Sequence, residues 1–250
     1  MSNFKREVDN NIASLASDPS LWDKSLSWML DVGRHRYTYN FQWLGRPIIQ
    51  YPQDIIQIQE LIFQVKPDLV IETGIAHGGS IIMSASSLSI LDVMEGLDPR
   101  ASKRKVIGID IDIREHNRDA LAKHPLNFKY ELIEGSSTDN SIFSKVRDQA
   151  VHFNTVMVFL DSNHTHEHVL AELNSYASLV SIGSYVVVFD TAIEDLPPGS
   201  FDNRPWDVGN NPKTAVYEWL RSHPEFEIDK AINNKLLVSV APDGYLKRLA

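Results

Sequence analysis

An apolar run that ends in an acid and continues into alternating small residues constrains this chain most. It covers residues 69–80 and reads Leu-Val-Ile-Glu-Thr-Gly-Ile-Ala-His-Gly-Gly-Ser. A short run of Val, Ile and Leu is typical of a parallel strand buried on both faces. Gly74, Ala76 and Gly78 then let the backbone turn tightly beside a bound nucleotide. The segment predicts a strand, a nucleotide-binding loop and a helix in succession; the alternative is a plain tight turn between a strand and a helix.

The loop departs from the dinucleotide-binding fingerprint. That fingerprint needs G-x-G-x-x-G, whereas this chain has an acid followed by G-x-A-x-G-G. The pattern is closer to the S-adenosylmethionine (SAM) loop of methyltransferases. We therefore expect cofactor contacts from Gly74, Ala76, Gly78 and Ser80.

The strand-and-helix pattern repeats along the rest of the chain. Apolar runs predict strands at 69–72, 106–110, 128–133, 156–160, 185–189 and 235–240, and helical patterns lie near 79–91, 114–123, 139–149, 166–180 and 212–222. This alternation predicts an α/β fold with a parallel sheet, helices on both faces, and ligands at the carboxyl ends of the strands. The run 235–240 is expected to be a hairpin partner or a closing edge strand.

The N-terminal part differs in character. Residues 1 to about 30 are polar with a sparse helical apolar pattern, which predicts one or two helices that form a cover. We place a helical extension at 1–36 and a single globular unit at 37–250. Aromatic side chains with Gly and Pro follow at 37–47, where Tyr39 and Trp43 offer stacking surfaces for a substrate. The alternative is a loop whose aromatic side chains fill the core.

Composition excludes several classes of function. The net charge of −9 argues against a nucleic-acid-binding surface. The absence of cysteine excludes disulfides, thiol nucleophiles and cysteine-ligated metal sites. The N-terminus has no apolar signal core, and no apolar run approaches about 18 residues, so we expect no membrane insertion and a cytoplasmic location.

Polar residues at strand ends suggest cofactor contacts. Asp110 follows the second strand and can accept hydrogen bonds from both ribose hydroxyls of a nucleotide, with Asp112 as the alternative. Ser136 and Ser137 follow the next strand, where an adenine edge would lie. The alternative for this serine pair is the start of helix 139–149.

Asp161 and His164 are the expected catalytic corner. An acid at a strand tip with a histidine three residues later can hold a divalent ion and place a neutral imidazole beside a substrate hydroxyl. His166 and His168 alternate with His164, but the residues after them follow a helical pattern. We therefore interpret His166 and His168 as residues of a helix start rather than as zinc ligands.

The fifth strand and the loop after it complete the candidate site. Asp190 and Thr191 reach the same sheet edge as Asp161, and two carboxylates suit a hard cation such as Mg²⁺. The alternative is solvated strand ends. A lip for the acceptor is expected downstream from Arg204, Trp206 and Asn211. That segment could instead be an elaborate helix start, with Asn211 as the cap and Pro212 in the first helical position.

The chain resembles the cephalosporin hydroxylase / rhamnosyl O-methyltransferase family over about residues 37–248. The resemblance rests on Trp43-Leu44-Gly45, the segment 67–80, Asp161-Ser162-Asn163-His164, Asp190-Thr191, the segment 209–216 and Gly244-Tyr245-Leu246. It implies a Rossmann-like class I methyltransferase fold with a seven-stranded sheet. It also implies methyl transfer from SAM to a hydroxyl, often on a sugar, with Mg²⁺ in some relatives.

The resemblance also implies roles for single residues. Glu72, Gly74 and Asp110 would hold the cofactor, Asp161 and Asp190 the metal, and His164 would act as the base. Metal-binding relatives usually carry an acid directly before the position of Asp190, where this chain has Phe189; Thr191 or water would then be the substitute ligand.

We expect a homo-oligomeric O-methyltransferase that acts on a deoxysugar of a glycan, glycolipid or nucleotide sugar. The alternatives are a 2-oxoglutarate/iron hydroxylase, which would need a double-stranded β-helix, and a cofactor-binding module without catalysis.

Overall fold

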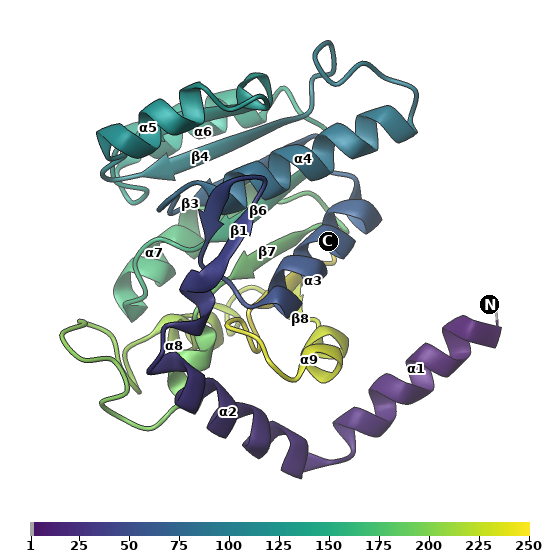
Figure 1. Cartoon of the computed structure of the whole chain (residues 1–250), viewed down its shortest axis with the longest axis vertical. Coiled ribbons are helices and arrows are strands. Elements are labelled where there is room, and N and C mark those ends of the chain that lie inside the picture. The colour runs from purple at the N-terminus through teal and green to yellow at the C-terminus, as the bar shows by residue number, and fades with distance from the viewer. Residues whose placement is uncertain (1–2) are drawn as a thin grey trace.

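A seven-stranded sheet forms the centre of the molecule in the computed structural model, which describes residues 3–250 (Figure 1). The pairs among the first five strands of the spatial order are all parallel, and β9 is antiparallel to both of its neighbours, β7 and β8. In spatial order they are β5 (Tyr130–Glu134), β4 (Lys105–Asp110), β3 (Leu69–Thr73), β6 (Val156–Leu160), β7 (Tyr185–Val188), β9 (Tyr245–Arg248) and β8 (Phe226–Ile228). The expected α/β fold with a mostly parallel sheet is confirmed.

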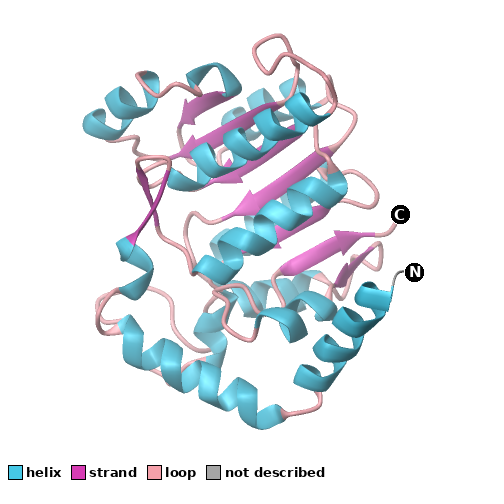
Figure 2. Cartoon of the chain, turned by 45° about the vertical axis from the view of Figure 1, so that its right-hand side comes forward, coloured by secondary structure: helices cyan, strands magenta, loops and turns pink. Residues whose placement is uncertain are grey.

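The apolar runs form central strands because both of their faces are covered. Every residue of β3 and of β6 is buried, and Ile71 pairs with Ile107 on one side and with Val158 on the other. Side chains from the two faces belong to two separate hydrophobic clusters. Figure 2 shows the sheet between its layers of helices. One cluster includes residues of α3 (Pro52–Val65), α4 (Gly79–Met94) and α5 (Glu115–Ala122), and the other those of α6 (Asn140–Ala150), α7 (His166–Tyr176) and α8 (Pro212–Trp219).

The order of the strands determines where a ligand can bind. From β3 the chain moves outward to β4 and β5, and it then returns to the other side of β3 to form β6 and β7. The connections therefore diverge between β3 and β6, and such a switch point opens a crevice at the carboxyl ends of the strands.

The prediction of a strand at 235–240 is wrong. Residues Lys230–Leu236 form α9, whose N-terminus is capped by Asp229. The residues that follow bind a buried carboxylate: Ser239 Oγ and Val240 N donate to the two oxygens of Asp54, at 2.6 and 2.9 Å. Because these polar groups are satisfied by α3, they pair with no strand. The sheet is closed instead by β9 and the edge strand β8.

The N-terminal region contains the two expected helices, α1 (Asn3–Ala16) and α2 (Pro19–Gly33). They form an arm along the lower side of the molecule in Figure 1, and α1 contacts α9. A 3₁₀ turn η1 (Tyr37–Asn40) then leads to a short hairpin of β1 (Phe41–Trp43) and β2 (Arg46–Ile48). Within residues 3–250, no helix combines the length and the apolar character that crossing a bilayer needs.

Candidate active site

Two adjoining cavities lie at the carboxyl edge of the sheet. The main cavity has a volume of about 390 Å³ and is lined by the loop after β3, by the acids at the ends of β4, β6 and β7, and by Tyr39, Arg204 and Trp206. The side cavity, of about 220 Å³, is lined among others by Asp110, Ser136, Ser137 and His168. Gly74 and Trp206 line both cavities. The sequence motifs from separate strands thus meet around one crevice.

The loop after β3 takes a conformation that needs small residues. Gly74 has a φ of +87°, and a Cβ at this position would lie 2.0 Å from the carbonyl oxygen of Asp161. Gly78 has a φ of +82°, and a Cβ there would lie 2.7 Å from the side chain of Leu121. Ala76 also has a positive φ, of 46°. Glycine is therefore required where the loop passes the end of β6.

Asp110 holds this loop from the neighbouring strand. One oxygen accepts hydrogen bonds from the backbone N–H groups of Ile75 and Ala76, at 2.8 and 3.2 Å, and the other accepts from Asp112 N at 3.1 Å. Asp112 itself is exposed and lines neither cavity. Of the two candidate ribose acids, only Asp110 therefore faces the crevice.

Glu72 lies behind the loop rather than in the lining of the two cavities. Its side chain is buried, Ser80 donates a hydrogen bond to Oε1, and Oε2 has no partner within residues 3–250. Burial raises the pKa of Glu72 to about 8, and the nearby charge of Asp110 adds to that rise. Ser80 lines the main cavity, so its hydrogen bond to Glu72 connects this acid to the cavity.

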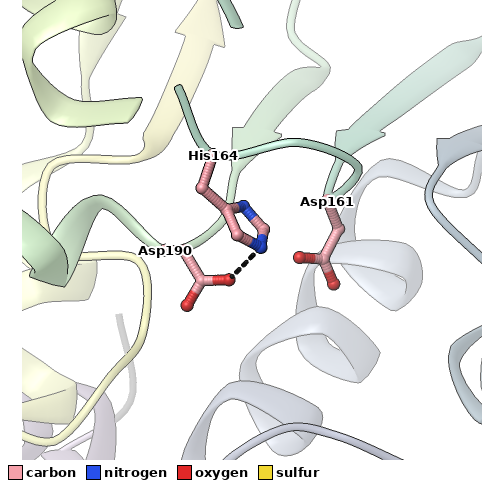
Figure 3. Close-up of side chains that lie close together, drawn as sticks. All are labelled: Asp161, His164 and Asp190. Carbon is pink, nitrogen blue, oxygen red and sulfur yellow. Dashed lines mark ion pairs between the residues drawn. The ribbon is translucent and has the colours of Figure 1, made fainter. Parts of the chain in front are cut away.

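Asp161, His164 and Asp190 converge, as Figure 3 shows. The Nε2 atom of His164 lies 3.0 Å from Oδ2 of Asp190, and one polar atom from each of the three residues lies within 4.8 Å of the others. Gln50 donates a hydrogen bond to Asp161 at 3.1 Å. Burial, and then the charge of Asp190, raise the pKa of Asp161 well above its ordinary value. Two carboxylates crowded in this way favour a proton or a cation between them.

The prediction of Thr191 as a metal ligand is not supported, because its hydroxyl serves the fold. Thr191 is fully buried and donates to the carbonyl oxygen of Pro242 at 2.6 Å. Phe189 is also buried, with its ring 6.2 Å from that of Phe159. The third group that faces the two carboxylates is His164.

The three alternating histidines point to different partners. His166 is the first residue of α7 and is held by α8: its Nδ1 lies 2.8 Å from Thr214 Oγ1, and its Nε2 lies 3.2 Å from Glu218. His168 contacts the hydroxyls of Ser137 and Ser162. The histidines do not gather around one point, in agreement with a helix start. Within residues 3–250 the one group of metal-binding side chains is the cluster of Asp161, His164 and Asp190.

Three of the five residues that we expected to bind the acceptor line a cavity. Tyr39, Arg204 and Trp206 line the main cavity. Trp206 meets the ring of His164 edge to face at 4.7 Å, and the Arg204 guanidinium lies over Trp206 at 5.1 Å. These three residues lie where an acceptor can reach His164.

Trp43, expected to offer a stacking surface, and Asn211, expected in the acceptor lip, line neither cavity. The indole of Trp43 donates to Ser86 Oγ on α4 at 2.9 Å, and the ring packs against the core. Asn211 is fully buried and caps α8 by accepting from the N–H groups of Lys213 and Thr214. Both side chains therefore stabilise the fold, which matches the alternatives that the sequence left open for them.

Sequence reasoning missed Gln50, His77 and Phe201, which also line the main cavity. Gln50 contacts Asp161 across 111 positions of the chain, so no local pattern could reveal it.

Comparisons with known proteins match the chain to one family. The family described as rhamnosyl O-methyltransferase/CmcI matches residues 35–249. The chain belongs to this family. The rhamnosyl O-methyltransferase of Mycobacterium leprae (strain TN) is 27% identical over 82% of this chain and 82% of its own length. The rhamnosyl O-methyltransferase of Mycobacterium tuberculosis (strain ATCC 25618 / H37Rv) is 28% identical over 86% of this chain and 83% of its own length.

Solved structures of the rhamnosyl O-methyltransferase/CmcI family share the fold. A CmcI structure with Mg and SAM has a TM-score of 0.55 at 17% identity and covers 85% of this chain and 78% of its own. An apo structure of CmcI has a TM-score of 0.58 at 19% identity and covers 85% of this chain and 77% of its own. The expected family, its fold and its class of enzyme, an O-methyltransferase, are confirmed. The parallel sheet is also not the double-stranded β-helix that the hydroxylase alternative requires.

Proposed function

We propose that this protein transfers the methyl group of SAM to a hydroxyl of a sugar, most specifically of a deoxysugar such as a rhamnosyl residue. One observation carries the proposal: the SAM-type loop and Asp110 border the same crevice as the group of Asp161, His164 and Asp190. A cofactor and an acceptor hydroxyl can thus meet there. The names of the curated relatives support a rhamnosyl acceptor.

The cofactor would bind across both cavities. The loop residues Gly74, Ala76 and Ser80, which line the main cavity, would face its amino-acid part, while Gly78 lines neither cavity and serves the turn of the loop. Asp110 would accept from the ribose hydroxyls, and Ser136 and Ser137 would meet the adenine. SAM supplies an electrophilic methyl group on a positively charged sulfur. The acids of this crevice fit a cationic cofactor, because carboxylates attract positive charge at close range.

His164 would remove the proton of the acceptor hydroxyl. Its Nε2 faces the carboxylates of Asp161 and Asp190 at the edge of the main cavity. A neutral imidazole takes this proton on the ring nitrogen that carries no hydrogen, and it becomes positively charged on doing so. Asp190, 3.0 Å away, would then stabilise that charge.

Asp161 and Asp190 would hold a Mg²⁺ ion. Their crowding supports this assignment, since burial and then the charge of Asp190 raise the pKa of Asp161, and a cation between the two carboxylates relieves the repulsion. Mg²⁺, when bound, lowers the pKa of an oxygen acid such as a sugar hydroxyl. With Phe189 in place of a third acid, we expect weaker binding than in a site with three carboxylates.

The acceptor would lie against Tyr39, Arg204 and Trp206. Aromatic rings pack against the apolar faces of sugars, and a guanidinium donates to their oxygens. This part of the site would position the hydroxyl beside His164, and such positioning accounts for much of the rate of a group transfer.

A screen of acceptors tests this proposal. The purified protein is incubated with SAM and a panel of nucleotide sugars, glycosides and glycolipids that contain deoxysugars, and products are analysed by mass spectrometry. We expect an O-methylated sugar and one equivalent of S-adenosylhomocysteine (SAH). Oxygen insertion that depends on iron and 2-oxoglutarate would favour the hydroxylase instead. SAH binding without turnover on any acceptor would favour the non-catalytic module.

A further inference from the structure

A hydrogen-bond network runs from the lining of the side cavity to a buried acid, and the proposed function gives no role to His168 or Glu172. Its centre is His168, whose Nε2 lies 3.0 Å from Ser162 Oγ, 3.2 Å from Ser137 Oγ and 3.5 Å from an oxygen of Glu172. Glu172 is fully buried in α7, and its Oε2 has no partner within residues 3–250. Burial of a carboxylate is costly unless it is compensated. A fully buried acid beside a ligand cavity therefore calls for an explanation.

The protons of this network can be assigned by counting. Ser162 has one hydroxyl proton, and it donates that proton to Oε1 of Glu172 at 2.7 Å. Ser162 Oγ can then only accept from His168. With Glu172 accepting as a carboxylate, Nε2 of His168 carries the proton that Ser162 accepts, and Glu172 fixes this polarity through Ser162.

This assignment determines what Ser137 can do. Its Oγ contacts the same Nε2–H, so Ser137 accepts there, and its own hydroxyl proton remains available. Ser137 is 5% exposed, and the hydroxyl of Tyr176 donates to its backbone carbonyl at 3.0 Å. A nearly buried hydroxyl held in this way offers one donor to whatever occupies the side cavity.

The side cavity fits a flat heterocycle with acceptor atoms on its edge. Ile109, Ile111 and Trp206 supply apolar surface, while Ser137 and His168 supply the polar rim. Asp110 lines the same cavity. If Asp110 binds the ribose, as the proposed function holds, the base attached to that ribose extends into this space.

We propose that Ser137 donates a hydrogen bond to an unprotonated ring nitrogen of the cofactor's adenine, and that His168 and Glu172 are positioning residues that fix this direction of donation. This inference rests on the proposed function, because it takes adenine as the occupant. It gives His168 and Glu172 a role, and it requires Ser137 to donate, and the adenine nitrogen to accept, in their hydrogen bond.

Binding of deaza analogues tests the contact. Dissociation constants are measured by calorimetry for SAH and for its 1-deaza, 3-deaza and 7-deaza analogues, with the wild type, Ser137→Ala and His168→Gln. A lost hydrogen bond weakens binding about threefold to tenfold. We expect Ser137→Ala to weaken SAH binding by that factor but to leave the affinity for one deaza analogue unchanged. His168→Gln keeps an N–H donor and should keep the wild-type order of affinities.

Three results would decide against the contact or the network. If Ser137→Ala weakens SAH and all three analogues equally, Ser137 makes no specific contact with a ring nitrogen. If Ser137→Ala leaves SAH affinity unchanged, there is no contact. If ¹⁵N NMR of the imidazoles finds the neutral ring of His168 protonated on Nδ1, the assigned polarity is wrong.

The control variant is His166→Ala, because His166 is held by α8 and lines neither cavity. It should reproduce the wild-type affinities for all four ligands. If the wild type binds neither SAH nor any analogue, the proposed function itself fails, and this outcome differs from a loss of discrimination among analogues.

Discussion

Replacing Glu72 with glutamine removes an ionisable group from the centre of the fold while keeping its shape. Glu72 is 1% exposed, and burial raises its pKa from 4.5 to about 8. The carboxyl is therefore mostly protonated in the folded protein at neutral pH and ionised in the unfolded chain. Folding takes up a proton at this position.

The direction of the pH dependence follows from this uptake. The contribution of Glu72 to stability is complete below about pH 4.5 and is lost as the pH rises through about 8. Each pH unit within this window is worth about 1.4 kcal/mol of unfolding free energy. From pH 6 to 7.5 the loss is therefore about 2 kcal/mol. Burial also raises the pKa of Asp54, to about 6, so its effect on the unfolding free energy falls mainly below this pH interval. Because Asp54 is present in all variants, that effect cancels in the comparison.

Urea unfolding followed by tryptophan fluorescence measures this difference. The wild type and the control Glu115→Gln, which changes an exposed side chain in the first turn of α5, should lose about 2 kcal/mol more than Glu72→Gln between pH 6 and 7.5. Equal losses in all three proteins would show that Glu72 is ionised in the folded state, and the reasoning from burial would then be refuted.

Three further predictions concern the active site. Asp110→Ala should weaken SAH binding about tenfold to a hundredfold in calorimetry, because hydrogen bonds to a charged group are lost; a comparable loss in Asp112→Ala alone would move the ribose contact there. His164→Ala should lower kcat about 10²- to 10⁴-fold with the Kd for SAH nearly unchanged, and an inactive His166→Ala beside an active His164→Ala would overturn the choice of base. Chelation should reduce turnover and Mg²⁺ should restore it; full activity without bound metal in elemental analysis would leave the aspartates to position the substrate.

The strands that form the site could be predicted because their signal is local. A run such as Val156–Leu160 must be buried on both faces, and the acid that follows it must lie at the sheet edge. Asp110, Asp161 and Asp190 thus reached the same crevice as expected. The boundary between 1–36 and 37–250 and the homo-oligomeric state remain predictions.

The errors arose where a distant partner decides the structure. Val238–Val240 alternates like a strand, yet its polar groups bind Asp54, which lies far away in the sequence. Trp43 looks like a stacking residue until Ser86 is known to accept from its indole. The start of α8 shows the opposite case, since Asn211 before Pro212 is a local capping signal that proved right.

The most direct test of the account follows a labelled methyl group. The protein is incubated with SAM carrying ¹³C in its methyl group and with a deoxysugar acceptor, and NMR follows the label. We expect the sulfonium methyl signal to decay while a methyl ether signal on the sugar grows at the same rate, and we expect His164→Ala to slow both. A label that stays on SAM with every acceptor, or that moves to nitrogen or carbon rather than to a sugar oxygen, would contradict the proposed methyl transfer.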